Sequence, residues 1–501
     1  MNARHGSRWL LACGSLAACA VAPARPVVTS APNLPVFVSA PADESFRAIP
    51  PTPQPEPPFR PPAVQVSTLT NGMRLLIVER HSFRLATAEL VVVGGSAGIP
   101  QETAASVDLM ISCLTAGTKS LSQTQLFDEM NTHLIELQPR MGDNAFTLSM
   151  RAPSRWFELG LRLLRAAALE STFPNGEFEI FRNQQIGRAR LAAENTALIA
   201  QRNLFGAMYG PRHPYARAYA PRDQDLAKVT RDDVVRVWRE VMDPADAVLV
   251  VAGDVDPREV TRLAEAEFGG WTHDPRFPRR PPVPPPVPSA ARLVVVDRPG
   301  ARRATVLYGM PAAGMRSVQH PVDLVIRDLL GGMRSSTLAT EMRHEIGATW
   351  RTGVGFSLHP TMGLEWWYGD VAPARTTAVL QALDQRLRDL REQGPSADEL
   401  AAARANVVRA FPRFFELIGQ VVNRLAEAVM DDLPLDEASQ TMARVNEVSA
   451  DQVRAAVPEP GAVKVVVVGD LASLKEPLAG LGWGAIDVND ADGHRLRTLS
   501  P

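Results

Sequence analysis

Histidine spacing is the first place where this sequence could carry catalytic chemistry. Zinc peptidases commonly hold their metal with two histidines four residues apart on one helix face, and a glutamate between them acts as general base. The nine histidines here stand at positions 5, 81, 133, 213, 273, 320, 344, 359 and 494, and the closest two are 15 positions apart. A zincin-type pair is therefore excluded, and only a relocated zinc site built from distant ligands stays open.

The three cysteines offer little redox or nucleophilic chemistry. Cys13 and Cys19 lie in the first twenty residues, so a mature fold would keep Cys113 alone. A disulfide framework is excluded on that count. We interpret Cys113 as a small buried apolar residue and not as a nucleophile.

A serine-hydrolase pattern occurs once, at residues 94–98. Gly94-Gly95-Ser96-Ala97-Gly98 matches the G-x-S-x-G nucleophile elbow and follows an apolar strand candidate. The elbow needs a helix that starts directly after the serine, and Gly98 and Pro100 oppose that start. We therefore interpret Ser96 as part of a strand-end turn, and a Ser96→Ala variant that lost a measured esterase activity would revive the alternative.

Composition narrows the class of protein. The chain has 501 residues, of which 45% are hydrophobic and 22% charged, as in an ordinary soluble globular protein of two to four domains. The net charge of -2 gives no reason to expect a nucleic-acid-binding surface. No apolar run of about 20 residues occurs, so no spanning helix is predicted.

The N-terminus has the features of a targeting segment. A short basic and apolar stretch ends in Leu16-Ala17-Ala18-Cys19, which resembles a bacterial lipobox. This predicts a signal peptide over 1–18 and a lipid anchor on Cys19; an ordinary signal peptide cut near Ala20 is the alternative. Paired prolines then indicate a semi-stiff tether over 19–63.

The rest of the chain repeats itself on either side of a second proline-rich segment, 279–291. Gly253-Asp254 ends an apolar run in the first half, and Gly469-Asp470 ends one in the second. Further pairs share nearly the same offset, such as Ala86-Thr87 with Ala304-Thr305 and Asp108-Leu109 with Asp323-Leu324. These matches predict two homologous domains over 64–278 and 292–485, followed by a tail over 486–501.

Each half is predicted to contain early strands, then long helices, then a final strand. This order indicates an α+β fold of two homologous halves, each a mostly antiparallel sheet packed by helices. In the first half, strands are expected at 74–78, 88–93, 146–151 and 248–252, and helices at 102–115, 155–170, 176–204, 231–242 and 257–268.

A series of short motifs runs along both halves in a fixed order. These motifs are Leu69–Val78, Gly95-Ser96, Leu114–Thr118, Tyr209-Gly210, His213–Tyr215, Leu293–Pro299, Leu329–Gly332, Ser335-Ser336 and Met342–Trp350. Taken together they resemble the insulinase/pitrilysin family of zinc metallopeptidases, which includes the subunits of the mitochondrial processing peptidase. The match runs from about Val66 to about Trp483, and the order of its motifs is more specific than any one of them.

The resemblance implies a zinc motif, H-x-x-E-H, at residues 108–112, where this chain has Asp108, Ile111 and Ser112 at the three functional positions. The family's later glutamate ligand would fall near Arg188-Ala189-Arg190. All four functional groups are missing, so we expect neither metal ligands nor catalytic residues here, and no cofactor. Asp108 is interpreted as a polar helix position or as a partner for an arginine.

The resemblance also implies a pair in the second half that steadies the oxyanion. Arg343 holds the arginine position, and Trp350 replaces the tyrosine seven residues on. Both are candidate substrate-binding residues, possible also in trans at a partner's site. The alternative is a surface ion pair for Arg343 and a core position for Trp350.

In this family, two such chains or one double-length chain enclose a chamber that takes unfolded peptides. We therefore expect a non-catalytic, lipid-anchored subunit that holds substrate beside an active zinc-peptidase homologue, on the periplasmic face of the outer membrane. A homodimeric peptide-binding or scaffold lipoprotein is the second hypothesis, and an active peptidase with a relocated zinc site is the third.

Overall fold

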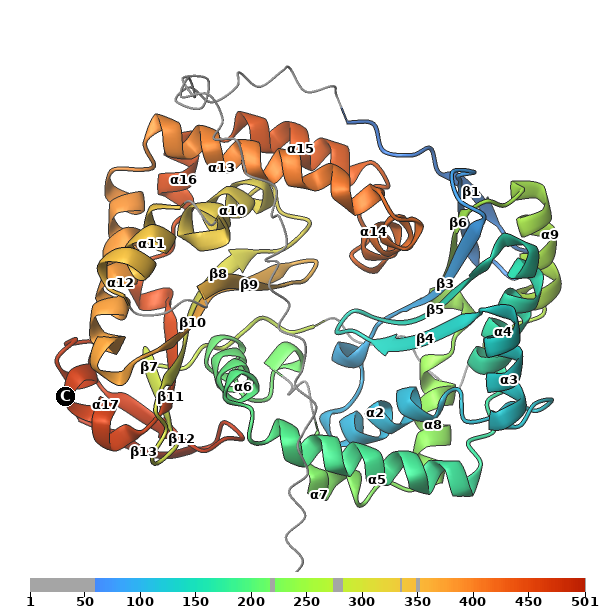
Figure 1. Ribbon diagram of the computed structural model, residues 1–501, viewed down its shortest axis with the longest axis horizontal. Coiled ribbons are helices and arrows are strands. Elements are labelled where there is room, and N and C mark those ends of the chain that lie inside the picture. Colours follow the sequence, from blue (N-terminus) through green and yellow to red (C-terminus); the bar gives the residue numbers. More distant parts are fainter. Residues whose placement is uncertain (1–58, 217–220, 274–282, 334–335, 348–351, 501) are drawn as a thin grey trace, which may run out of the picture. The chain divides into compact units, whose positions relative to one another are not determined.

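The computed structural model describes residues 59–501 apart from 217–220, 274–282, 334–335, 348–351 and 501, and residues 59–501 form one compact unit (Figure 1). The predicted signal peptide, Cys19, most of the tether, part of the 279–291 linker and Trp350 lie outside the described residues. Within the described part, no helix is both long and apolar enough to cross a membrane.

The first half is built on a six-stranded sheet in the order β1-β2-β6-β3-β5-β4. Only the β2–β6 pair is parallel. Its strands are β1 (Gln65–Thr68), β2 (Arg74–Glu79), β3 (Leu85–Val93), β4 (Glu136–Met141), β5 (Ala145–Pro153) and β6 (Ala247–Gly253). Alternate residues of β2 serve opposite faces: Leu75 and Ile77 join one core, while Leu76 and Val78 join another.

The second half is built on a seven-stranded sheet in the order β13-β12-β7-β11-β8-β10-β9. Its strands are β7 (Leu293–Asp297), β8 (Ala304–Ala313), β9 (Thr352–Leu358), β10 (Met362–Val371), β11 (Lys464–Gly469), β12 (Ile486–Asn489) and β13 (Arg495–Leu499). The expectation that a tail follows residue 485 is therefore wrong. The strand β12 pairs with β7 and with β13, so this segment extends the sheet.

Strand register supports the internal duplication. Thr87 in β3 pairs with Ala252, the residue before Gly253, and Thr305 in β8 pairs with Val468, the residue before Gly469. The parallel pairs also correspond, since Gly253 lies opposite Glu79 and Gly469 opposite Asp297. The α+β class with two halves is confirmed.

One face of each sheet is covered by helices of the same half, and these helices occupy corresponding places in the two halves. In the first half these are α2 (Ala104–Cys113), α3 (Gln123–His133), α4 (Phe157–Leu169), α5 (Asn175–Ala192), α7 (Asp223–Leu226), α8 (Arg231–Val241) and α9 (Pro257–Phe268). In the second they are α10 (His320–Arg327), α11 (Thr337–Thr340), α12 (Thr376–Glu392), α13 (Ala397–Ala410), α15 (Glu437–Glu447), α16 (Ala450–Ala456) and α17 (Leu471–Ala479).

The other face of each sheet is covered by a helix from the opposite half. The helix α6 (Thr196–Tyr209) packs on β8 and β11 of the second sheet, and Phe205 shares a buried cluster with Leu307 and Val466. The helix α14 (Ile418–Met430) packs on β3 and β6 of the first sheet, and Val421 shares a buried cluster with Val250. Both helices are labelled in Figure 1. The two halves are thus joined by a reciprocal exchange of helices.

This exchange explains one error of the sequence analysis. The single helix expected over 176–204 is two helices, because α5 ends at Ala192 and α6 starts at Thr196. The side chain of Asn195 caps α6 by accepting the backbone N–H groups of Ala197 and Leu198. The break lets α6 leave the first half and reach the second sheet.

Candidate functional site

Residues 108–112, where the family's zinc motif would lie, belong to α2, and α2 packs against α5. Ser112 Oγ donates to the backbone oxygen of Asp108 at 2.9 Å and accepts a short hydrogen bond from Gln185 Nε2 of α5. Ile111 is half-buried and packs against the core of the first half. A local polar network therefore holds α2 against α5.

Electrostatics at this place do not suit a cation. Burial raises the pKa of the Asp108 carboxyl, and the nearby positive charge of Arg188 opposes that shift. The other aligned positions offer an aliphatic side chain and a hydroxyl already engaged, so the residues present do not fit a zinc ion. Among the described residues, no group of three or more His, Cys, Asp or Glu side chains could hold a metal.

Ser96 and Cys113 have no arrangement suited to nucleophilic catalysis. Ser96 begins a three-residue 3-10 turn and donates to Asp143 Oδ1 at 3.2 Å, while α2 starts eight residues later at Ala104. A nucleophile elbow would place the helix directly after the serine. Cys113 is buried, and burial raises the pKa of its thiol to about 12, so it stays protonated.

The candidate substrate-binding pair is only partly described. Arg343 lies in the short helix η7 (Glu341–Glu345), which packs against α11, and its side chain is half-buried. Trp350 falls outside the described residues. The structure therefore leaves the role of this pair a prediction.

The described residues enclose a cavity of about 820 Å³ that sequence reasoning missed. Its walls come from α10, η6 (Asp328–Gly332), β9, the end of α13, η9 (Phe411–Phe415), α14 and α15, with the β4–β5 turn at one side. Figure 1 shows these helices gathered around β9. The one local signal that could have pointed here is the aromatic run Phe411-Pro412-Arg413-Phe414-Phe415.

The edge strand β9 forms one wall of this cavity, and its outer edge is open. His359 N–H donates to the oxygen of Met362, which fixes the hydrogen-bonded positions of the β9–β10 hairpin. Because such positions alternate in an antiparallel ladder, Val354, Phe356 and Leu358 direct their N–H and C=O groups away from β10. None of these groups has a backbone partner on the outer side among the described residues.

The strand β4, at one edge of the first sheet, differs in this respect. The bond from Gly142 N–H to the Ala145 oxygen sets the β4–β5 register, and it places Pro139 among the outward-facing positions of β4. Proline has no N–H to offer, so the row of donors along β4 is interrupted. The edge of β9, in contrast, has no proline and adjoins the cavity of about 820 Å³.

Two buried histidines line the cavity in their neutral form. Burial lowers the pKa of His320 to about 4 and that of His359 to about 3. His359 stacks on Tyr215 with ring centroids 3.4 Å apart, and its Nε2 lies 3.2 Å from Ser357 Oγ. Nδ1 of each histidine is buried and has no hydrogen-bond partner among the described residues.

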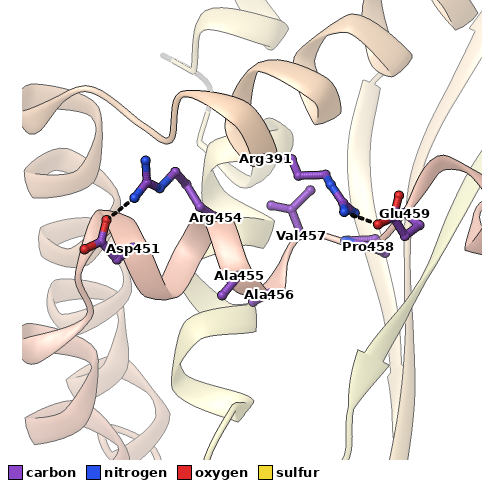
Figure 2. A pocket seen from close by; sticks show the side chains of 8 residues that line it. All are labelled: Arg391, Asp451, Arg454, Ala455, Ala456, Val457, Pro458 and Glu459. Carbon is purple, nitrogen blue, oxygen red and sulfur yellow. Dashed lines mark hydrogen bonds and ion pairs between the residues drawn. The ribbon is translucent and has the colours of Figure 1, made fainter.

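A second hollow, of about 620 Å³, is a weaker candidate. Figure 2 shows its charged side chains paired with one another: Arg454 donates to Asp451 at 2.5 Å, and Arg391 forms a short ion pair with Glu459. These charges satisfy each other on the surface and leave little to recognise a ligand.

Comparison with known proteins tests the predicted resemblance. A profile described as the peptidase M16 inactive domain matches residues 228–407, from just before α8 into α13. A crystal structure of a peptidase M16 inactive domain from Pseudomonas fluorescens superposes with a TM-score of 0.74 at 17% identity, covering 81% of this chain and 98% of that one. Residues 228–407 thus resemble an M16 inactive domain, and the chain shares its fold with one. The predicted resemblance to insulinase-like peptidases is confirmed.

Two curated relatives are named uncharacterized zinc proteases. The one from Streptomyces coelicolor is 27% identical over 239 residues, which are 45% of this chain and 50% of that protein. The one from Mycobacterium leprae is 24% identical over 255 residues, 50% of this chain and 56% of that protein. The chain thus spans about half the length of the curated relatives it matches.

The fold of this chain is also shared with the periplasmic protease PqqL from Escherichia coli. The TM-score is 0.68 at 16% identity, and the match covers 84% of this chain but 47% of that one. One chain of this size therefore corresponds to about half of that protease.

Proposed function

We propose that this chain is a non-catalytic M16 peptidase-like subunit that holds extended peptide segments for an active zinc-peptidase homologue. The observation that carries the proposal is the open edge of β9 beside a large cavity, in a chain whose α2 has Asp108, Ile111 and Ser112 where the family's zinc motif would be.

Strand addition is the binding mode that this edge favours. An extended peptide would pair with the outward N–H and C=O groups of Val354, Phe356 and Leu358. Residues of a strand advance about 3.4 Å each, so these groups serve a peptide of about five residues. Main-chain pairing supplies affinity without demanding one sequence, while the cavity accepts alternate side chains. Such a mode suits a protein that holds varied unfolded substrates.

A partner chain would supply the chemistry. The structural match covers only 47% of PqqL, which leaves room in that protease for a second unit of similar size. By analogy, this subunit would pair with a chain that carries the H-x-x-E-H motif. Arg343 and Trp350 are the residues we propose to face the shared substrate.

We also propose that Cys19 carries the lipid that holds the subunit at the periplasmic face of the outer membrane. The support is the Leu16-Ala17-Ala18-Cys19 segment and the proline-rich stretch that follows it. A Cys19→Ala variant should move from the membrane fraction to the soluble fraction. A variant that stayed in the membrane fraction would contradict the anchor.

The subunit hypothesis is tested by co-expression with an H-x-x-E-H homologue from the same genome. We expect the two chains to co-purify and the complex to hydrolyse an unfolded peptide faster than the active homologue alone. If the two chains formed no complex and the activity did not change, the subunit role would be ruled out. The homodimeric scaffold would then be favoured if the chain alone eluted as a dimer on size-exclusion chromatography and bound the peptide.

A further inference from the structure

Two exposed arginine–phenylalanine pairs occur among the walls of the cavity. The guanidinium of Arg327, at the end of α10, lies 5.0 Å from the ring centroid of Phe356 on β9. That of Arg413, in η9, lies 5.1 Å from the ring centroid of Phe414. Phe356 is 54% exposed and Phe414 37% exposed, so both pairs are accessible from solvent. A guanidinium that stacks on a ring keeps its edge N–H groups free to bind an anion.

Neither Arg327 nor Arg413 forms an ion pair with a residue that the structure describes. The carboxyl groups that interact with Arg327, those of Asp328 and Glu365, are buried, and burial raises the pKa of both, that of Glu365 to about 8. Glu365 is therefore mostly protonated at neutral pH and adds little negative charge beside Arg327.

The other acidic groups of the cavity have partners of their own. Glu427 and Glu437 share Arg424, with N–O distances of 2.5 and 3.5 Å. Asp431 accepts a hydrogen bond from Asn144 at 3.1 Å, and burial raises its pKa to about 7. Asp143 accepts a hydrogen bond from Ser96 Oγ at 3.2 Å. Arg327 and Arg413 are thus the two cavity arginines without an ion-pair partner among the described residues, and Arg327 lies beside β9.

We infer that this cavity selects extended peptides that carry acidic side chains, with Arg327 and Arg413 as the residues that bind the carboxylates. The inference rests on the proposed peptide-holding function and adds a substrate class to it. A peptide paired along β9 would pass Arg327 and its Phe356 partner, and a planar guanidinium matches a carboxylate with two parallel hydrogen bonds. The aromatic rings would cover the aliphatic parts of the same peptide.

The test uses the full chain and three fluorescent peptides of one unstructured sequence, with Glu, Gln or Lys at the same alternate positions. Fluorescence anisotropy at neutral pH should give a Kd about tenfold lower for the Glu peptide than for the Gln peptide, and the weakest binding for the Lys peptide. Arg327→Gln and Arg413→Gln should each reduce that ratio. Arg155→Gln is the matched control, because Arg155 also stacks on an aromatic ring, 5.7 Å from the centroid of Trp156, but lies outside this cavity.

The outcomes separate the inference from the function on which it rests. Equal affinity for the Glu and Gln peptides would overturn the acidic selection and leave peptide holding intact. A preference that survived in both cavity variants would also overturn it, since the selecting charges would lie elsewhere. Failure of all three peptides to bind would remove the proposed function itself. A thermal unfolding curve for each variant, matched to that of the wild-type chain, makes the loss of preference attributable to the charge.

Discussion

Replacing Val354 by proline is the sharpest test of strand addition along β9. The N–H of Val354 points away from β10, so its loss removes no hydrogen bond of the existing ladder. The preceding residue is Gly353, which tolerates the backbone restriction that a following proline imposes. The variant should therefore fold, while its edge lacks one of the outward donors.

The expected loss follows from one missing hydrogen bond. A backbone hydrogen bond contributes about 1 kcal/mol net, and a peptide carbonyl left without its donor adds a desolvation cost. Together these amount to about 1–2 kcal/mol, which is about a five- to thirtyfold increase in Kd for an extended peptide.

Leu137→Pro is the matched control for this prediction. It removes an outward N–H from β4, an edge strand of the first sheet, where Pro139 already interrupts the row of donors. Fluorescence anisotropy with one peptide should show weakened binding for Val354→Pro and unchanged binding for Leu137→Pro. Unchanged binding in both variants would refute strand addition on β9. Weakening only in Leu137→Pro would move the site to the first sheet.

Three further predictions concern metal content, packing and pH. The purified fragment Ala20–Pro501, dialysed against a trace of zinc, should contain far less than one zinc per chain by elemental analysis; about one per chain would require distant ligands and restore the relocated-site hypothesis. Leu425→Ala, in the part of α14 buried on the first sheet, should lower the free energy of unfolding in urea by about 2–4 kcal/mol, and a loss below about 1 kcal/mol would mean that α14 is loosely packed. Burial raises the pKa of Asp431 to about 7, so its contribution to stability is full below pH ~4 and is lost as the pH rises toward 7. Asp431→Asn should therefore raise the urea midpoint more at pH 8 than at pH 5, and an equal effect at both would show that the carboxyl is not protonated in the fold.

The sequence predicts those features that local patterns encode. Capping residues such as Ser449 with Gln452 mark helix starts, and the structure has that capping box. The Gly-Asp pairs at the ends of β6 and β11 show the duplication, because each half needs the same turn after its central strand. The missing zinc residues can likewise be found by counting, since helix positions keep their spacing.

Local sequence patterns do not predict how segments distant in the sequence pack against one another. The apolar face of α14 predicts burial but does not say which sheet it covers, so the exchange of α6 and α14 could not be foreseen. The strands β12 and β13 are four and five residues long, and β13 is mostly exposed, which gives little hydrophobic signal. The cavity brings together residues as distant in sequence as Gly142 and Met442, a juxtaposition that only the fold creates.

The exchanged helices have a consequence for dissecting this protein. A cut between Phe268 at the end of α9 and Leu293 at the start of β7 would give one fragment that contains α6 and another that contains α14. Each fragment would present a valine-rich sheet face without its cover, together with an amphipathic helix shaped for the other fragment. Expressed singly, the fragments should aggregate, whereas expressed together they should reassemble. The chain would thereby serve as a split protein whose reconstitution requires both pieces.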